Sequence, residues 1–282
     1  MIACEAGRRI NEFNAQGMAN TVWAFATAGI AAQLLFEAIA EEVRRRIVEF
    51  NAQNMASTVW AFATAGTRAH SLFEAIAAEA RRRIAEFNAQ NMANTAWAFA
   101  CAGWVRSEVF VQLGAALAGR LVELNERDKA QLFLVALYVR AEWPELDFSF
   151  LVDLKSLRAA YARRKTEPSE LQGDVSVMLE HMGWSHTSEY VTKEGILLDL
   201  AQPDSKRAIE VCGRRHSLKD VTSGEFVVNG ATQFKSRLVR RYGWQVSLVA
   251  FFEFDEKSES ERRELLLRKL GELEAPDEEQ SL

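Results

Sequence analysis

Residues 51–66 read NAQNMASTVWAFATAG, and two other segments of the chain repeat these letters almost unchanged. Residues 14–29 read NAQGMANTVWAFATAG and residues 88–103 read NAQNMANTAWAFACAG, so successive copies begin 37 residues apart. A weaker fourth copy begins at Asn125, where the apolar positions persist while the tryptophan and the final glycine are absent. A fixed period of this length is typical of helical repeat arrays, in which each unit packs against its neighbours.

Each period contains two segments with a helical pattern. Apolar residues recur at every fourth position from Leu35 to Ile47, which predicts an amphipathic helix over residues 35–50 and its counterparts in the later repeats. A second helix is predicted to follow, because Asn51 can cap its first turn and Gly66 can take the left-handed conformation that ends a helix. Stacked hairpins can bury the recurring tryptophans and phenylalanines that one hairpin cannot, so the sequence predicts an α-solenoid of about four units.

Two recurring features of the repeats allow both a structural and a functional interpretation. Tryptophans and phenylalanines at helical spacing indicate packing between repeats, with stacking on RNA bases as the alternative. The arginine triplets at residues 44–46 and 81–83 fit a solvated helix face that pairs with nearby glutamates. The same triplets, repeating at a constant period, would also fit evenly spaced contacts with RNA phosphates.

A few polar positions vary between otherwise near-identical repeats. In helical-repeat proteins that read RNA, one repeat meets one base through two or three such side chains. Local capping and solvent-facing variation near a helix start is the structural alternative. The candidate base-reading residues are Asn20, Ser57, Asn94 and Gln131 at one repeat position, and Asn54 and Asn91 at another.

The composition of the 282-residue chain is that of an ordinary globular protein, with 49% hydrophobic and 26% charged residues. Polar residues interrupt every apolar run before the roughly 18 residues that a spanning helix needs, so we expect no membrane partner. The three cysteines are widely separated, which argues against a disulfide framework and a structural zinc site. The net charge of −5 excludes a generally basic surface, so a site for a polyanion must be local.

The character of the sequence changes after about residue 165, from rich in Ala, Asn and Arg to richer in Val, Gly and Ser. We therefore expect a repeat array over residues 1–165, an α/β domain over residues 169–275 and an acidic tail over residues 276–282. In the second part, helices are predicted over residues 169–182, 230–242 and 259–273, and strands over residues 189–191, 196–202, 206–212 and 245–252.

The central hairpin of the predicted α/β domain brings two carboxylates together. If Asp204 and Ser205 form a two-residue turn after Pro203, Asp199 faces Glu210 directly across the antiparallel pair. Two carboxylates in this position repel each other unless a cation, a proton or a basic side chain lies between them. A three-residue turn would break this pairing. The period of two then predicts a buried face with Leu198, Leu200, Ile209 and Val211, and an opposite face with Asp199, Glu210 and Cys212.

A local basic patch is predicted beside this hairpin. Arg237, Arg240 and Arg241 share one face of the helix predicted over residues 230–242, by their spacing of three and four residues. Their alternative role is to balance nearby acidic side chains as solvated charges. The full set of candidate RNA-binding residues is Arg214, Arg215, His216, Lys235, Arg237, Arg240 and Arg241.

Two segments carry a resemblance to a known family. Residues 196–217 read ILLDLAQPDSKRAIEVCGRRHS, and residues 232–254 read TQFKSRLVRRYGWQVSLVAFFEF. Together they resemble the RAP domain, a small module of the restriction-endonuclease-like fold, in which a strand Asp precedes a strand of E-V-D-G-P-x-H type and a basic helix ending in Gly-Trp. The matching positions are Asp199, Glu210, Val211, Gly213, His216, Lys235, Arg237, Gly243 and Trp244. The resemblance covers about residues 195–270.

The repeats resemble octotricopeptide-type helical repeats, which often precede RAP domains, and the whole arrangement is similar to that of the FAST-kinase-domain family. The resemblance implies a protein of the mitochondrial matrix or the chloroplast that binds single-stranded RNA in RNA processing, mRNA stability or translation. It also implies other organellar RNA-processing proteins as partners and no small-molecule cofactor. The first 13 residues, MIACEAGRRINEF, contain no recognisable targeting segment.

One position departs from the nucleases of this fold. Those enzymes use an Asp followed by Glu-x-Lys, so that the carboxylates hold a divalent metal, whereas this chain has Cys212 in place of the lysine. We therefore expect binding rather than catalysis. A metal-dependent endoribonuclease is the first alternative, with Asp199 and Glu210 as ligands for Mg²⁺ or Mn²⁺ and with Lys235, His216 or Lys206 in place of the missing lysine. The second alternative is a protein scaffold whose solenoid groove takes a peptide.

Overall fold

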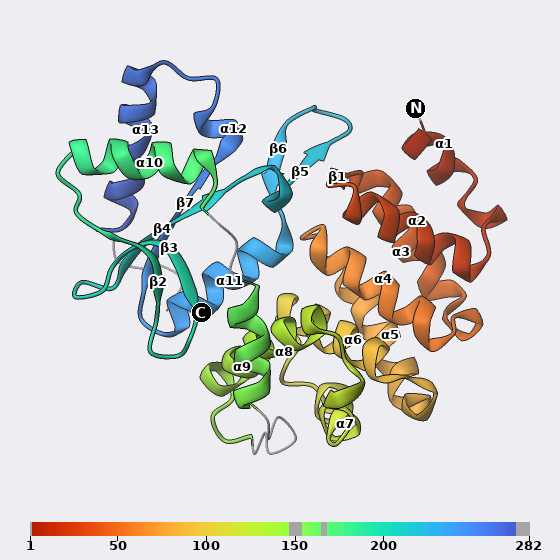
Figure 1. Cartoon of the computed structure of the whole chain (residues 1–282). Helices are drawn as coiled ribbons and strands as arrows, with labels where there is room; N and C mark the ends of the chain where they lie inside the picture. Colours follow the sequence, from red (N-terminus) through yellow and green to blue (C-terminus); the bar gives the residue numbers. More distant parts are fainter. Residues whose placement is uncertain (1, 147–153, 165–167, 275–282) are drawn as a thin grey trace. The chain divides into compact units, whose positions relative to one another are not determined.

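The computed structural model describes residues 2–146, 154–164 and 168–274, and the predicted acidic tail lies outside them (Figure 1). The chain forms two compact units. The first contains Met1–Arg164 together with Leu218–Phe234, and the second contains Lys165–Ser217 together with Lys235–Leu282. Residues 218–234, which the sequence analysis assigned to the C-terminal domain, therefore group with the helical repeats. No helix among these described ranges has the length and hydropathy that crossing a membrane requires.

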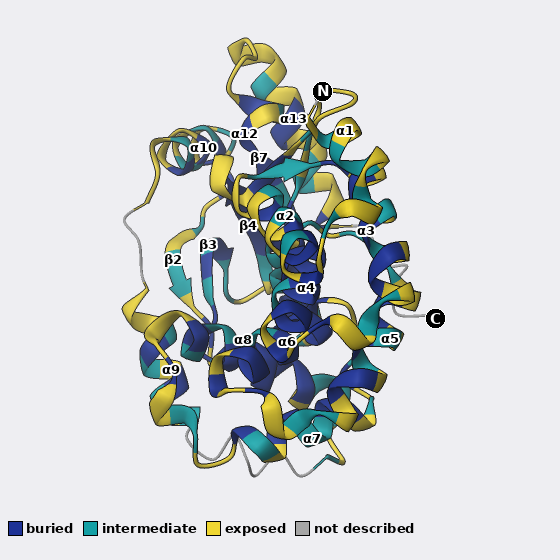
Figure 2. Cartoon of the chain, turned by 90° about the vertical axis from the view of Figure 1, so that its right-hand side faces the viewer, coloured by how far each residue is buried: buried dark blue, intermediate teal, exposed yellow. Residues whose placement is uncertain are grey.

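The first unit consists of paired helices. Helices α2, α4, α6 and α8, the second helices of successive repeats, pack against one another in that order, and α4, α6 and α8 are largely buried (Figure 2). The helices are α1 (Ile2–Arg8), α2 (Ala15–Thr27), α3 (Gln33–Arg45), α4 (Ala52–Thr64), α5 (His70–Arg82), α6 (Ala89–Cys101), α7 (Glu108–Leu117), α8 (Glu126–Glu142) and α9 (Leu154–Arg163). The predicted 37-residue hairpin repeat is confirmed over this unit.

The predicted helix signals are confirmed at the second helix of each repeat. The side chain of Asn51 accepts a hydrogen bond from the Asn54 amide at 2.8 Å, and the asparagines that precede α2, α6 and α8 do the same. Gly66 ends its repeat helix with φ of +66°, in the left-handed region. The predicted first helix over residues 35–50 is shorter than expected, because the α-helix ends at Arg45 and Ile47–Glu49 form a 3-10 turn.

The arginine triplets hold the repeats together. Arg83 Nη1 donates to the Phe50 carbonyl of the preceding repeat at 2.8 Å, and its guanidinium also pairs with Glu86 at 2.7 Å. Arg46 donates to the Phe13 carbonyl at 2.9 Å in the same way. Arg82 pairs with the buried Glu79 at 3.1 Å. These bonds support the structural interpretation of the triplets over evenly spaced phosphate contacts.

The recurring aromatic side chains pack between repeats, as the structural interpretation predicts. The ring centroids of Trp60 and Trp97 lie 5.9 Å apart, and those of Phe36 and Phe62 lie 4.9 Å apart. Trp60 and Trp97 are 8% and 2% exposed, whereas their counterpart Trp23 in the first repeat is 48% exposed. The aromatic stripe is therefore mainly a core feature.

A small sheet connects the first repeat to residues 218–234. Strand β1 (Ile30–Ala31) pairs in parallel with β5 (Ser217–Asp220), and β6 (Phe226–Val228) follows at the sheet edge. Helix α11 (Gly230–Arg241) then begins with its first turn capped by Asn229, which accepts from the Thr232 amide at 3.0 Å. The sequence did not predict β1, β5 or β6.

The second unit has a four-stranded mixed sheet in the order β2-β3-β4-β7, in which β4 and β7 are parallel and the other neighbours are antiparallel. Side chains from both α10 and α13 pack with the strands in its core. The elements are α10 (Glu170–His181), β2 (Thr187–Val191), β3 (Leu197–Gln202), β4 (Arg207–Cys212), β7 (Gln245–Ala250), α12 (Phe251–Phe254) and α13 (Glu259–Glu272). The strand predicted over residues 245–252 ends at Ala250, because the chain turns into α12 and Glu253 accepts from the Ala250 amide at 3.2 Å.

The predicted register of the central hairpin is confirmed. Leu200 pairs with Ile209 and Gln202 pairs with Arg207, so the register continues to Asp199 opposite Glu210. Pro203 to Lys206 form the turn, closed by a 3.3 Å hydrogen bond from the Lys206 amide to the Pro203 carbonyl. Glu210 and Cys212 are 5% and 2% exposed, so the face opposite the leucines is buried as well.

Candidate functional site

Three side chains predicted for the site meet on this second face of the sheet. Asp199 Oδ2 on β3 accepts a hydrogen bond from the Val211 amide on β4 at 2.8 Å. Lys235 Nζ on α11 lies 2.5 Å from Glu210 Oε2 on β4. A basic side chain therefore lies against the two facing carboxylates, which is one of the arrangements that their mutual repulsion requires.

The surroundings of Glu210 disfavour the ionised form of its carboxyl group. Its Oε1 atom is buried and has no hydrogen-bond partner within the described part of the chain. Burial, followed by the nearby charge of Asp199, raises the pKa of Glu210 to about 7, against the opposing effect of the Lys235 ammonium. The carboxyl group of Glu210 therefore titrates near neutral pH.

The pKa values of two other predicted site residues, Cys212 and His216, are also shifted. Burial, with the adjacent charges of Glu210 and Asp199, raises the pKa of the Cys212 thiol to about 12. Cys212 thus stays a neutral thiol, which neither replaces a lysine ammonium nor is a preferred ligand for Mg²⁺. Partial removal from water, followed by the charge of Lys235, lowers the pKa of His216, and the Arg215 guanidinium adds to the effect. Lys235 and Arg215 therefore both lie within electrostatic reach of His216.

The donor set does not fit a divalent metal in this arrangement. Across residues 2–146, 154–164 and 168–274, no group of three or more His, Cys, Asp and Glu side chains is placed to hold a metal ion. Only Asp199 and Glu210 converge, and the Lys235 ammonium already binds one oxygen of Glu210. Magnesium and calcium take six or more oxygen ligands, several from carboxylates or water, and a metal here would compete with that ammonium.

The structure separates the predicted basic residues into two groups. Arg240 donates to the Val246 carbonyl at 2.8 Å, and Arg214 lies 4.5 Å from the centre of the Phe251 ring, so both side chains help to hold the fold. Arg214, Arg215, His216 and Arg241 are exposed, whereas Lys235, Arg237 and Arg240 are half-buried. The exposed group is the one that a phosphate can reach.

Sequence reasoning missed one polar residue that supports the site and assigned another a different role. Gln172 on α10 is buried and donates to Glu189 Oε1 at 2.7 Å and to the Asp199 carbonyl at 3.4 Å. Lys206 donates to the Tyr242 carbonyl at the end of α11 at 3.1 Å. Gln172 lies in an ordinary helical pattern, so the sequence carries no signal for its role.

The candidate base-reading residues differ in exposure. Asn20 is exposed, and Ser57, Asn94 and Gln131 are half-buried. Asn54 and Asn91 are each 8% exposed, and each donates its backbone amide to the capping asparagine three residues earlier. Their position matches the structural alternative of local capping, and base reading by any of the six stays a prediction.

Comparison with known proteins gives two similarities. Residues 2–139 match the family model of the RNA-editing substrate-binding complex 6 protein. The chain is also 28% identical over 147 residues to a RAP domain-containing protein, chloroplastic, of Oryza sativa subsp. japonica, an alignment that covers 50% of this chain and 22% of that protein. The chain thus spans about a fifth of the length of this relative. It resembles the first family through its helical repeats and the chloroplastic RAP-domain protein over half of its own length.

Proposed function

We propose that the chain is an organellar RNA-binding protein that acts in RNA processing, mRNA stability or translation, in mitochondria or chloroplasts. Both similarities support this proposal, since one family is described by binding RNA-editing substrates and the other relative is a chloroplastic RAP-domain protein. The finer resemblances, to the restriction-endonuclease-like fold and to the FAST-kinase-domain arrangement, belong to the same proposal. Single-stranded RNA and other organellar RNA-processing proteins are the partners that it implies.

One observation in the second unit carries the RNA-binding role. Arg214, Arg215 and His216 follow the end of β4 and are exposed, and after burial the charges of Lys235 and Arg215 lower the pKa of His216. A local cluster of positive charge in a chain of net charge −5 is the arrangement that phosphate binding needs. In this mechanism the cluster holds phosphates while the repeats follow the strand, with Asn20, Ser57, Asn94 and Gln131 as candidate contacts to bases.

Metal-dependent RNA cleavage is the second candidate function. The convergence of Asp199, Glu210 and Lys235 favours it, because the same residue types meet in nucleases that use a carboxylate pair. Against it stand the buried thiol of Cys212 and the ammonium that already neutralises Glu210. RNA binding without cleavage is therefore the better-supported function.

Incubation of the purified chain with labelled single-stranded RNA tests both functions in one experiment. The mixtures contain either Mn²⁺ or EDTA and are read on native and denaturing gels. We expect a shifted and intact RNA in both mixtures. Fragments that form only with Mn²⁺ and disappear in Asp199→Ala would establish the nuclease instead. A lack of both shift and cleavage would refute the RNA-binding proposal.

A further inference from the structure

A polar cavity of about 690 Å³ lies within the first unit, and none of the residues assigned to RNA lines it. Its walls are the start of α3, the turn between α4 and α5, the β5–β6 hairpin and Gln233 at the start of α11. All of these segments belong to the same compact unit. Pockets that bind small ligands or short peptide segments have volumes of roughly 300–1,000 Å³, so the cavity is large enough for one.

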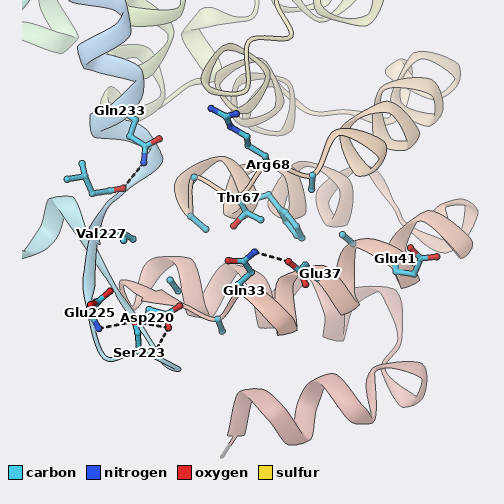
Figure 3. Close-up of a pocket in the computed structure, with 18 of the residues that line it drawn as sticks. Gln33, Glu37, Glu41, Thr67, Arg68, Asp220, Ser223, Glu225, Val227 and Gln233 are labelled. Carbon is cyan, nitrogen blue, oxygen red and sulfur yellow. Dashed lines mark hydrogen bonds between the residues drawn. The ribbon is translucent and has the colours of Figure 1, made fainter.

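The charge of the cavity is strongly one-sided. Glu37, Glu41, Asp220 and Glu225 line it, with Arg68 as the cationic residue among the lining side chains. Figure 3 shows the acidic side chains along α3 and the β5–β6 hairpin, with Arg68 on the opposite side. A ring of this sign repels RNA phosphates and attracts a cationic ligand.

Glu41 pairs with Arg44 at 3.5 Å, whereas Glu37, Asp220 and Glu225 form no ion pair within the described chain. Glu37 accepts only from the neutral amide of Gln33, at 2.8 Å. Asp220 accepts from the backbone amides of Thr222 and Ser223, each at 2.8 Å, and these bonds lower the pKa of Asp220. Asp220 is therefore ionised at neutral pH, and neither group has a cationic partner among the described residues that an added cation would have to displace.

The cavity also borders a strand edge that is partly open. The Val228 carbonyl on this edge already accepts from Gln233 Nε2 at 2.8 Å. Val227 lines the cavity from β6, which is an edge strand of the β1-β5-β6 sheet. An edge strand can take an extended peptide as an added strand, with side-chain pockets supplying specificity. A polyamine or a metal ion would use the charge but not the strand edge.

We propose that this cavity binds a basic, extended segment of a partner protein. The segment lies along β6, and its arginine or lysine side chains reach Glu37, Asp220 and Glu225. This site is independent of the proposed RNA function, because its charge is of the opposite sign and its residues are different.

Fluorescence anisotropy with a labelled peptide of alternating arginine and threonine tests the proposal. We expect saturable binding that weakens as salt is raised, and no binding of the matching peptide of glutamate and threonine. The double variant Glu37→Gln with Glu225→Gln should weaken binding of the basic peptide at least ~tenfold, since two of the charges that attract it are removed without a change of shape.

The matched control changes the same number of charges outside the cavity. Glu74 is the counterpart of Glu37 in the next repeat and does not line the cavity, and Glu264 is exposed on α13. Glu74→Gln with Glu264→Gln should leave peptide binding unchanged. Equal weakening by the two double variants, no binding of the basic peptide, or full displacement of the peptide by spermine at equal charge concentration would overturn the proposal. RNA binding should be the same in both double variants, so that failure of either proposal can be told apart from failure of the other.

Discussion

Gly230→Ala should destabilise the first unit by about 3 kcal/mol, because an overpacked site with no room for a methyl group costs roughly 1–3 kcal/mol or more. A Cβ atom at position 230 would overlap the carbonyl oxygen of Ala63 and lie 3.1 Å from the Gly66 amide nitrogen. Both contacts are with backbone atoms at the end of α4, which cannot rotate away as a side chain can. The start of α11 must therefore move away from the repeat, or α4 must lose its last turn.

Gly173→Ala is the matched control for this prediction. Gly173 lies inside α10, and a Cβ atom there would meet nothing within 4 Å. Alanine should stabilise this helix by about 0.5–1 kcal/mol, because glycine loses more backbone entropy on folding. Urea denaturation of the two variants measures both effects. If Gly230→Ala proves as stable as Gly173→Ala, the close packing of α11 on α4 is wrong.

Lys235→Met should destabilise the second unit by about 3–5 kcal/mol at about pH 8, the usual cost of removing one partner of a buried ion pair. Lys235 is the ammonium that neutralises Glu210, whose side chain is buried next to Asp199. Without Lys235, an ionised Glu210 would be buried with no positive partner and with little hydration. At about pH 5.5 Glu210 should be protonated and uncharged in the variant. The loss of stability should therefore be smaller at this pH.

The sign of this pH dependence follows from the direction of the shift. The folded-state pKa of Glu210 is about 7, above the ordinary value of 4.5, so the folded protein keeps a proton that the unfolded chain releases. The contribution of Glu210 to stability therefore falls as pH rises through this window. Lys235→Met removes a group that lowers this pKa, so the fall should continue above pH 7. An equal loss of stability at both pH values would contradict this explanation. A loss of the same size in the double variant Lys235→Met with Glu210→Gln, which has no carboxylate at position 210, would also contradict it.

The repeat and the central hairpin could be predicted because their signals are local. Asn51 caps the start of the helix and Gly66 ends it, and both signals involve residues only a few positions away. The 37-residue period shows the same pattern three times. The pairing of Asp199 with Glu210 depends only on a short turn and on the period of two along each strand. These features do not depend on how distant parts of the chain pack.

The features that sequence reasoning missed depend on distant partners. Strand β1 has two residues and forms because β5, far along the chain, offers a parallel partner. The bond from Arg83 to the Phe50 carbonyl joins consecutive repeats, and an arginine triplet alone does not distinguish this role from a phosphate contact. The cavity lined by Glu37 and Glu225 exists because residues 218–234 pack on the first repeats, which composition and spacing do not reveal.

The affinity for single-stranded RNA of one pair of charge-reversal variants tests the central claim most directly. Arg215→Glu with Arg241→Glu reverses two exposed charges among the candidate RNA-binding residues, whereas Arg8→Glu with Arg263→Glu reverses two exposed charges outside this set. Measured at one fixed ionic strength, the first pair should weaken RNA binding at least ~tenfold and reduce its salt dependence by about two phosphate contacts. The second pair should bind as the unmodified chain does. Equal affinities for both pairs would contradict the assignment of RNA binding to these residues.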